Sequence, residues 1–365
     1  MTTTWNDLAD KMLADGGPAA LVCRQWLIPA EGRDAVIFPP TFAAPEGGGR
    51  AGYNIDEIHD SDNPNKVTRI AIIDTVGSQA NRMEPLFRAT NGEDTRYSRL
   101  VPQIEIKAGT KVVNLLDAGH RAADAIVRFS GLGPTLSEAF DIYQQTGDAT
   151  RLAKIAPTSL VFGAWDSRGT QAKLPRLVAS TIRAYDVVEL RRSAQYNPPI
   201  DYIALGLIEN PNDKKVLDAA SELGFRHAPA GGTHGGIIVR GEIRREAILS
   251  LVGLRAVGPK GSSGNALRRY LLGLALLALM HEREHNLRQG CLLVQDPEKK
   301  PLWELVMHDG VRTSISPDVA AASAFAEQAA AAFGVGEDRT VAFDAKAANK
   351  ALKEQVADDR GKKVV

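Results

Sequence analysis

The chain has 365 residues, of which 44% are hydrophobic and 24% charged, and its formal net charge is +0. These values are those of a soluble globular protein with one large domain or two ordinary ones. Taken alone, the zero net charge argues against a strong nucleic-acid binder, but acids dominate residues 1–64 and bases dominate residues 239–290.

The sequence predicts neither a cleavable signal peptide nor a membrane-spanning helix. The first fifteen residues carry three aspartates and no apolar core, so we expect no cleavable signal. The longest apolar run, LLGLALLALM at residues 271–280, has half of the ~20 residues that span a bilayer, which predicts a buried helix. Cys23 and Cys291 are too few for a disulfide framework, and we expect reduced thiols and a cytoplasmic protein.

The first half of the chain alternates between extended and helical patterns. In chain order we expect strands at 20–28 and 34–38, a long loop at 39–64 that contains Gly47, Gly48 and Gly49, a strand ending at Asp74 with a possible helix from Asn81, a strand at 100–107, and helices at 118–129 and 136–145.

The second half continues the same mixture. We expect a strand at 159–162, a basic helix at 172–185, an extended segment at 187–193, a flexible turn at 228–236, a strand at 237–243, a glycine-rich loop at 258–264, a helix at 265–287, strands at 291–295 and 303–307, and a helix at 318–333. Strands and helices interleave without a regular period, which favours an α+β fold with long insertions. We expect one domain over residues 1–345 and a helical or frayed tail over residues 346–365.

A polar loop after the strand that ends at Asp74 is the first candidate site. It contains Gly77, Ser78, Gln79, Asn81 and Arg82. Backbone amides, amide side chains and one guanidinium suit a phosphate or a nucleotide edge better than bond-breaking chemistry. The alternative is an ordinary turn with a helix cap, in which Ser and Asn are common.

Basic residues of the segment from Trp165 to Arg183 form the second candidate site. Lys173, Arg176 and Arg183 are spaced so that a helix would place them on one face, and Arg168 precedes them. Such a face would attract a polyanion, although a solvated helix face has the same pattern.

The glycine-rich loop GPKGSSG, residues 258–264, is the third candidate. Its Lys260, Ser262 and Ser263, with Arg268 and Arg269 just after it, could form an anion nest at the start of a helix. It is not a P-loop, because Asn265 follows the last glycine. A mobile connector is the alternative.

The sequence HEREH, residues 281–285, matches H-E-x-x-H. On a helix, His281 and His285 would share a face and could bind zinc, with Glu282 as general base of a hydrolase. No further histidine follows until His308, however, and the pair lies at the end of its expected helix. We therefore predict no metal and no cofactor.

Four blocks in order resemble one known family: residues 70–87, 100–130, 159–196 and 287–294. The chain resembles the backbone subunit of type I-G (formerly I-U) CRISPR effector complexes, a member of the RAMP superfamily, over roughly residues 20–310. The resemblance implies a ferredoxin-like, RRM-type antiparallel sheet with large insertions in a hand shape. It also implies that the serine-glutamine segment holds guide RNA, and the loop at 258–264 resembles the glycine-rich loop that RAMP proteins carry near their C-terminal end.

The function implied by this resemblance is non-enzymatic. Copies of the chain would polymerise along a CRISPR guide RNA, bind its phosphates and present its bases to target DNA. Partners would be a large subunit that recognises the flanking motif and a subunit that processes the guide. An inserted hairpin would serve as a thumb, with residues 39–64 and 228–236 as candidates. Some related subunits cut RNA with a loop aspartate, but Asp74, Asp117, Asp166 and Asp186 have no recognisable catalytic setting. We therefore expect no catalysis, and an RNA endonuclease of this kind is the alternative to that expectation.

Overall fold

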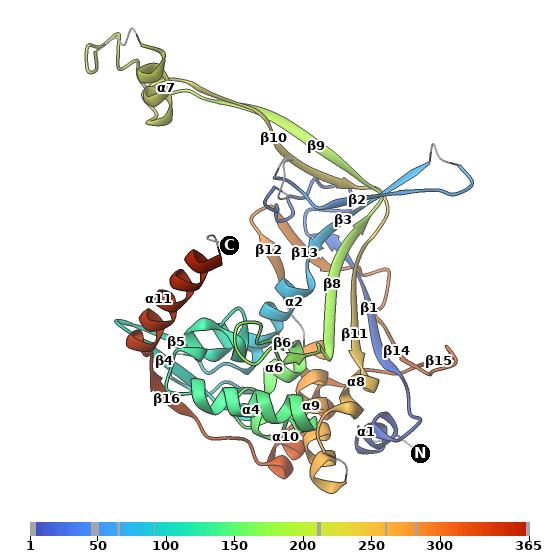
Figure 1. The fold of residues 1–365 in the computed structure, drawn as a ribbon. Helices are drawn as coiled ribbons and strands as arrows, with labels where there is room; N and C mark the ends of the chain where they lie inside the picture. Colours follow the sequence, from blue (N-terminus) through green and yellow to red (C-terminus); the bar gives the residue numbers. More distant parts are fainter. Residues whose placement is uncertain are drawn as a thin grey trace.

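One curled antiparallel sheet forms the centre of the protein, with helices on one of its faces (Figure 1). The structure is a computed structural model that describes residues 5–44, 51–63, 66–90, 92–209, 213–259, 261–281 and 284–362, without the side chains of residues 262–263 and 357–362. The predicted α+β class is confirmed. The strands of the central sheet are β1 (Ala20–Pro29), β2 (Ile55–His59), β3 (Val67–Asp74), β8 (Val178–Tyr185), β11 (Ile243–Ser250), β12 (His285–Arg288), β13 (Cys291–Gln295), β14 (Leu302–Val306) and β15 (Arg312–Ser314).

The strand order is that of a ferredoxin-like sheet with added edges. The order β13–β1–β11–β8 has antiparallel neighbours throughout, and in sequence these strands come fourth, first, third and second. This 4-1-3-2 order is typical of a split β-α-β unit. Strands β3 and β2 extend the sheet beyond β8, while β14 pairs with the first half of β1 and β13 with its end.

Helices cover the inner face of this sheet and form the larger core. The predicted buried helix over 271–280 is confirmed within α9, and every hydrophobic residue in this run is at most 6% exposed. No helix in the described ranges is long and apolar enough to cross a bilayer. The helices are α1 (Trp5–Leu13), α2 (Val76–Met83), α3 (Ala125–Arg128), α4 (Gly133–Thr146), α5 (Thr150–Ala153), α6 (Pro157–Phe162), α7 (Lys214–Glu222), α8 (Leu251–Ala256), α9 (Ser262–Met280), α10 (Val319–Phe333) and α11 (Ala345–Lys362), with short 3-10 turns η1 (Glu84–Phe87), η2 (Ser98–Leu100), η3 (Leu115–Asp117) and η4 (Arg121–Ala123).

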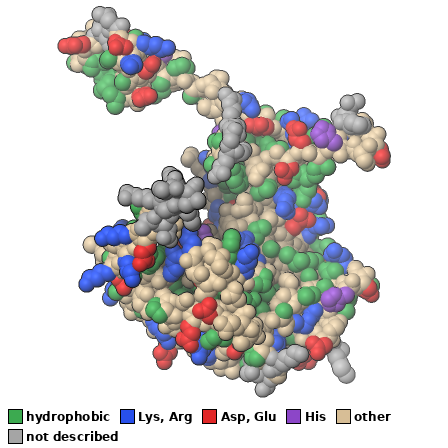
Figure 2. Space-filling model, viewed as in Figure 1, with side chains coloured by type: hydrophobic (Ala, Val, Ile, Leu, Met, Phe, Trp, Pro, Cys, Tyr) green, Lys and Arg blue, Asp and Glu red, His purple; other side chains and the backbone are tan. Residues whose placement is uncertain are grey.

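A long hairpin projects from the central sheet and carries α7 near its tip (Figure 1). Its strands are β9 (Val187–Tyr196) and β10 (Ala228–Val239), and we call this hairpin the arm. In Figure 2 the arm stands clear of the body, and Lys and Arg side chains gather on the body below it. Smaller sheets join β16 (Arg339–Ala342), β4 (Ile104–Ala108) and β5 (Lys111–Asn114), and β6 (Ala164–Trp165) with β7 (Lys173–Leu174).

Several local predictions are wrong where long-range pairing decides the structure. Residues 228–236 are not a flexible turn but most of β10, whose register shifts accommodate the glycines as bulges. Residues 39–64 include β2 as well as loop, and Gly47–Gly49 lie outside the described residues. Residues 34–38 form only one bridge, between Ile37 and Ile237.

Other differences concern helices. Residues 159–162 belong to α6 and not to a strand, because Pro157 starts the helix and Gly163, at φ +81°, ends it. The helix predicted over 118–129 is reduced to η4 and α3, and α9 begins at Ser262 and ends at Met280. The helix over 318–333 is confirmed as α10, with Asp318 as its N-cap.

Candidate nucleic-acid interface

Residues 76–83 form α2 directly after β3, so the predicted polar loop is wrong. The Thr75 side chain accepts a hydrogen bond from the Ser78 amide at 3.2 Å and caps the helix. This cap starts the helix five residues before the predicted start at Asn81. Gly77, Ser78 and Gln79 therefore lie in helical turns and do not form an open anion loop.

A buried chain of polar side chains runs from α2 into the sheet. Gln79 donates to Asp74 Oδ2 at 2.6 Å and accepts from Ser180 Oγ at 2.8 Å. Ser180 Oγ in turn accepts from Arg245 Nε at 3.2 Å, and at the other end Arg82 Nε donates to Asp74 at 3.2 Å. Burial raises the pKa of Asp74, although Gln79 and Arg82 oppose this shift. Gln79 is thus buried and holds α2 against β8.

Arg82 and Asn81 are the predicted loop residues whose side chains reach the surface of α2. The Arg82 side chain is 36% exposed and also donates to the backbone carbonyl of Leu287 at 3.0 Å. Asn81 is exposed and its Oδ1 accepts from Arg121 at 3.2 Å. These two side chains could contact a bound strand at the exposed edge of α2.

The hairpin β6–β7 carries an exposed aromatic ring with a lysine beside it. Trp165 is 54% exposed, and the Lys173 Nζ lies 4.8 Å from its ring centroid. Arg168 and Arg176 are exposed, and neither has an ion-pair partner in the described part of the chain. The nearby Asp166 is buried and accepts from Thr170, so its charge is turned away from this surface.

Arg121 joins this hairpin to α2. Its Nε lies 2.8 Å from Glu84 Oε2, and another guanidinium nitrogen donates to the Gly163 carbonyl at 3.3 Å. A Cβ on Gly163 would lie 2.5 Å from Arg176 Cγ, so this glycine lets the Arg176 side chain pass close to the backbone. Partial burial and the neighbouring Arg121 charge lower the pKa of Arg176. We call Lys173, which lies over the Trp165 ring, together with the exposed Arg168 and Arg176 of the same segment, the Trp165 cluster.

The predicted basic helix over 172–185 is wrong, because residues 178–185 are the strand β8. The strand contains the β-branched residues Val178, Thr181 and Ile182, and it pairs on one side with β3 and on the other with β11. Successive strand side chains point to opposite faces, so Ser180 faces α2 while Arg183 lies on the other face. The structure therefore separates Arg183 from the Trp165 cluster.

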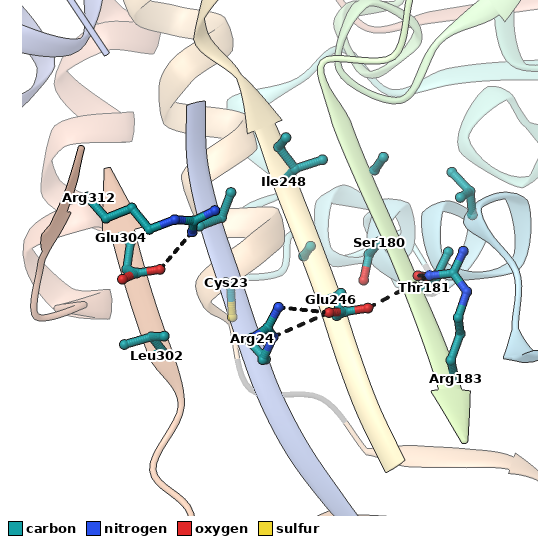
Figure 3. A pocket seen from close by; sticks show the side chains of 14 residues that line it. Cys23, Arg24, Ser180, Thr181, Arg183, Glu246, Ile248, Leu302, Glu304 and Arg312 are labelled. Atoms are coloured by element: carbon teal, nitrogen blue, oxygen red, sulfur yellow. Dashed lines mark hydrogen bonds and ion pairs between the residues drawn. The ribbon is translucent and has the colours of Figure 1, made fainter. Parts of the chain in front are cut away.

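The outer face of the sheet holds an open pocket of about 300 Å³, shown in Figure 3. Glu246 lies between Arg24 and Arg183, at 3.2 and 3.9 Å, while Arg312 is 2.9 Å from Glu304. All three arginines of this pocket therefore lie within 4 Å of a carboxylate, with Arg24 and Arg183 sharing Glu246. The outer face is consequently a weaker candidate for a polyanion than the Trp165 cluster.

The arginines of the third candidate site, Arg268 and Arg269, are held by contacts within the protein. Arg268 donates to the carbonyls of Val257 and Pro259, both at 3.2 Å. Arg269 pairs with Asp10 of α1 and lies 5.2 Å over the Phe325 ring of α10. Lys260 and the side chains of Ser262 and Ser263 lie outside the description.

The premise of the zinc alternative is wrong, because α9 ends before the motif. His281 is the C-cap residue of α9, and His285 is in strand β12, so the two do not share a helix face. Glu282 lies outside the described residues. Those that are described contain no group of three His, Cys, Asp or Glu side chains placed to hold a metal.

Comparison with known proteins agrees with one part of the resemblance. No curated protein matches the chain. Residues 21–189, from β1 into β9, match the model of a family described as CRISPR-associated protein GSU0053, and this stretch includes α2 and the Trp165 cluster. The match supports a CRISPR-associated protein with a role in CRISPR defence.

Proposed function

We propose that the protein is a cytoplasmic, non-enzymatic backbone subunit of a type I-G CRISPR effector complex. Copies would assemble along the guide RNA, bind its phosphates regardless of sequence and leave its bases to pair with target DNA. The observation that carries the proposal is the Trp165 cluster inside the family match: Lys173 lies over the exposed Trp165 ring, and the exposed Arg168 and Arg176 belong to the same segment of the chain.

The chemistry of this cluster fits a single strand of nucleic acid. Arg and Lys side chains neutralise phosphates, and an exposed indole offers a stacking surface that accepts any base. Arg168 and Arg176 have no ion-pair partner in the described ranges, so binding a phosphate would not require either to leave a carboxylate. Arg82 and Asn81 on α2 would extend the surface through the Arg121 link.

The arm is our candidate for the thumb. It contains residues 228–236, one of the two segments in which a thumb was expected, and it stands apart from the body. Its strand β9 carries the exposed cations Arg191 and Arg192. An arm of this kind could cross a bound strand and reach the next copy along the guide.

Charge neutralisation tests the RNA contact. Each phosphate contact on a single strand contributes about −0.7 to the slope of log affinity against log salt concentration. Between 1 M and 0.1 M salt, one such contact therefore changes the affinity by about fivefold. We expect Arg176→Gln to weaken RNA binding by about this factor and to reduce the slope by about 0.7, measured by fluorescence anisotropy with two guides of unrelated sequence.

The matched control is Arg151→Gln. Arg151 is an exposed arginine of α5, and it pairs with Glu138 of α4. We expect this variant to bind RNA like the unaltered protein. Weaker RNA binding by the control variant would contradict binding by the Trp165 cluster. Weaker binding by Arg176→Gln to only one of the two guides would contradict sequence-independent binding.

Assembly is tested separately by shortening the arm. Residue 191 pairs with residue 234, so residues 192–233 can be replaced by an Asn-Gly turn that closes the hairpin. After co-expression with a repeat-spacer array, we expect the full chain to elute as large assemblies with nucleic-acid-like absorbance. The shortened chain should still co-purify with RNA but should no longer form the series of large assemblies of increasing size. An unchanged ladder would rule out the arm as the thumb.

A further inference from the structure

Arg245 is a buried cation with unused hydrogen-bonding capacity. It lies on β11 and is 3% exposed. Its Nε donates to Ser180 and one terminal nitrogen lies 3.5 Å from Gln25 Oε1, but the other terminal nitrogen has no hydrogen-bond partner. Among the residues that the structure describes, no carboxylate forms an ion pair with it. Removing an arginine from water without a counter-charge costs several kcal/mol, so such a group calls for an explanation.

Arg245 lines an open cavity of about 1020 Å³ on the inner side of the sheet. The cavity lies where β13 and β14 diverge from β1 and where α9 ends. Its walls are partly apolar, with Leu279, Met280 and Trp303, and partly polar, with Gln25 and His285. Its volume is at the upper end of the range of small-molecule sites.

The charges around this cavity favour an anion at Arg245. Glu284 is the one carboxylate on the wall within the described residues, and it forms no ion pair with Arg245. The hydrogen bond to Ser180 and the 3.5 Å approach to Gln25 orient the guanidinium before any ligand arrives, and its unpaired terminal nitrogen is shielded from bulk solvent. A guanidinium edge binds carboxylate and phosphate oxygens in a planar, charge-assisted geometry.

We propose that this cavity binds a small organic anion whose carboxylate or phosphate group contacts Arg245. Its apolar body lies against Leu279, Met280 and Trp303, and the Gln25 amide donates a second hydrogen bond to the anion. The site is distinct from the Trp165 cluster and does not depend on the binding of RNA.

Benzoate and phenyl phosphate are suitable probes, with benzamide as the uncharged isostere of benzoate. In thermal unfolding and calorimetric titration of RNA-free protein, we expect at least one of the two anions to bind saturably. Benzamide should bind at least about tenfold more weakly than benzoate if the carboxylate is the preferred group. The relative affinities of benzoate and phenyl phosphate show which oxyanion the cavity prefers.

Two variants make the test specific. Arg245→Met removes the charge at similar volume, and because it also removes an uncompensated buried cation we expect it to fold with at least equal thermal stability. Its affinity for the anion should be at least about tenfold lower than that of the unaltered protein. Arg244→Gln is the matched control, because Arg244 stacks on Tyr185, with its guanidinium carbon 3.8 Å from the ring centroid.

Three results would overturn the proposal. One is an undiminished response in Arg245→Met, and a second is an equal loss in Arg244→Gln. The third is no binding of either anion at about 10 mM, which would be expected if a segment of a partner protein occupies the cavity instead.

Discussion

The buried pair of Arg121 and Glu84 provides the sharpest test of how α2 is attached to the hairpin β6–β7. Their side chains are 5% and 1% exposed, and their closest atoms are 2.8 Å apart. Removing one partner of such a pair leaves a buried charge without compensation, which costs about 3–5 kcal/mol. We therefore expect Arg121→Met to lower the free energy of unfolding by this amount at pH 7, measured by urea denaturation.

The double variant separates loss of the pair from loss of packing. In Arg121→Met/Glu84→Leu both charges are gone, and the remaining cost is mainly the lost donor to the Gly163 carbonyl, about 1–2 kcal/mol. The double variant should accordingly be more stable than Arg121→Met alone. If instead the two single losses add in the double variant, the two charges do not interact as described.

The pH dependence of the single variant has a defined sign. Burial already raises the pKa of Glu84, and removing Arg121 takes away the cation that opposes this shift. A carboxyl group with a raised pKa in the folded state binds a proton more tightly there than in the unfolded chain. As the pH falls through this raised pKa, stability is regained, so the loss in Arg121→Met should be smaller at pH 5 than at pH 8. The exposed pair of Arg151 and Glu138 is the control, since its removal should cost at most about 1 kcal/mol at either pH.

Three further outcomes follow from the packing and the charges. Gly273→Ala would place a Cβ 2.8 Å from the backbone of α10 and should cost about 1–3 kcal/mol in urea unfolding, whereas Gly119→Ala meets nothing within 4 Å and should leave the midpoint unchanged. The bidentate contact of Arg33 lowers the pKa of Asp296, so its stabilising contribution is present above the ordinary pKa of about 3.9 and is lost as the pH falls through the lowered value. Arg33→Gln should then raise the pKa of Asp296 in a carboxyl NMR titration, and an unchanged value would refute this. Burial raises the pKa of Cys291 to about 12, so native protein at pH 8 should not be alkylated there by iodoacetamide until denaturant is added, as peptide mass analysis would show.

Elements with strong local signals could be predicted from the sequence. Asp318 precedes an alanine-rich run and caps α10, and the apolar residues 271–280 could only be covered by burying them in α9. The strand β1 was likewise evident from its apolar residues. In each case the local preference and the tertiary contacts favour the same structure.

The candidate site could be predicted less well, because its arrangement depends on pairing between distant segments. Lys173, Arg176 and Arg183 have helical spacing, yet β8 is held between β3 and β11, and Arg183 ends on the outer face. Gln79 could be recognised as polar but not as buried, since its partner Ser180 lies 101 residues away.

The sequence indicates the burial of Arg245 but not that of Arg121. Arg245 alternates with Ile243, Ala247 and Leu249, all buried, so strand periodicity alone would have placed it inside the protein. Arg121 had no such pattern: its backbone is left-handed at φ +54°, and its ion-pair partner Glu84 lies 37 residues earlier in the chain.

The junction of the arm with the sheet has a mechanical consequence. Only Asp186 separates β8 from β9, and the hydrogen bonds continue across it from Arg240 and Gly241 to the opposite strand. A ten-residue strand extends about 33 Å, so a rotation of about 5° at this joint would displace the end of the strand by about 3 Å. Gly241 has no room for a Cβ, which would lie 2.6 Å from the Tyr185 carbonyl oxygen. A side chain at position 241 would therefore push this joint apart, and in the assembly that we propose the direction in which the arm points depends on this one small residue.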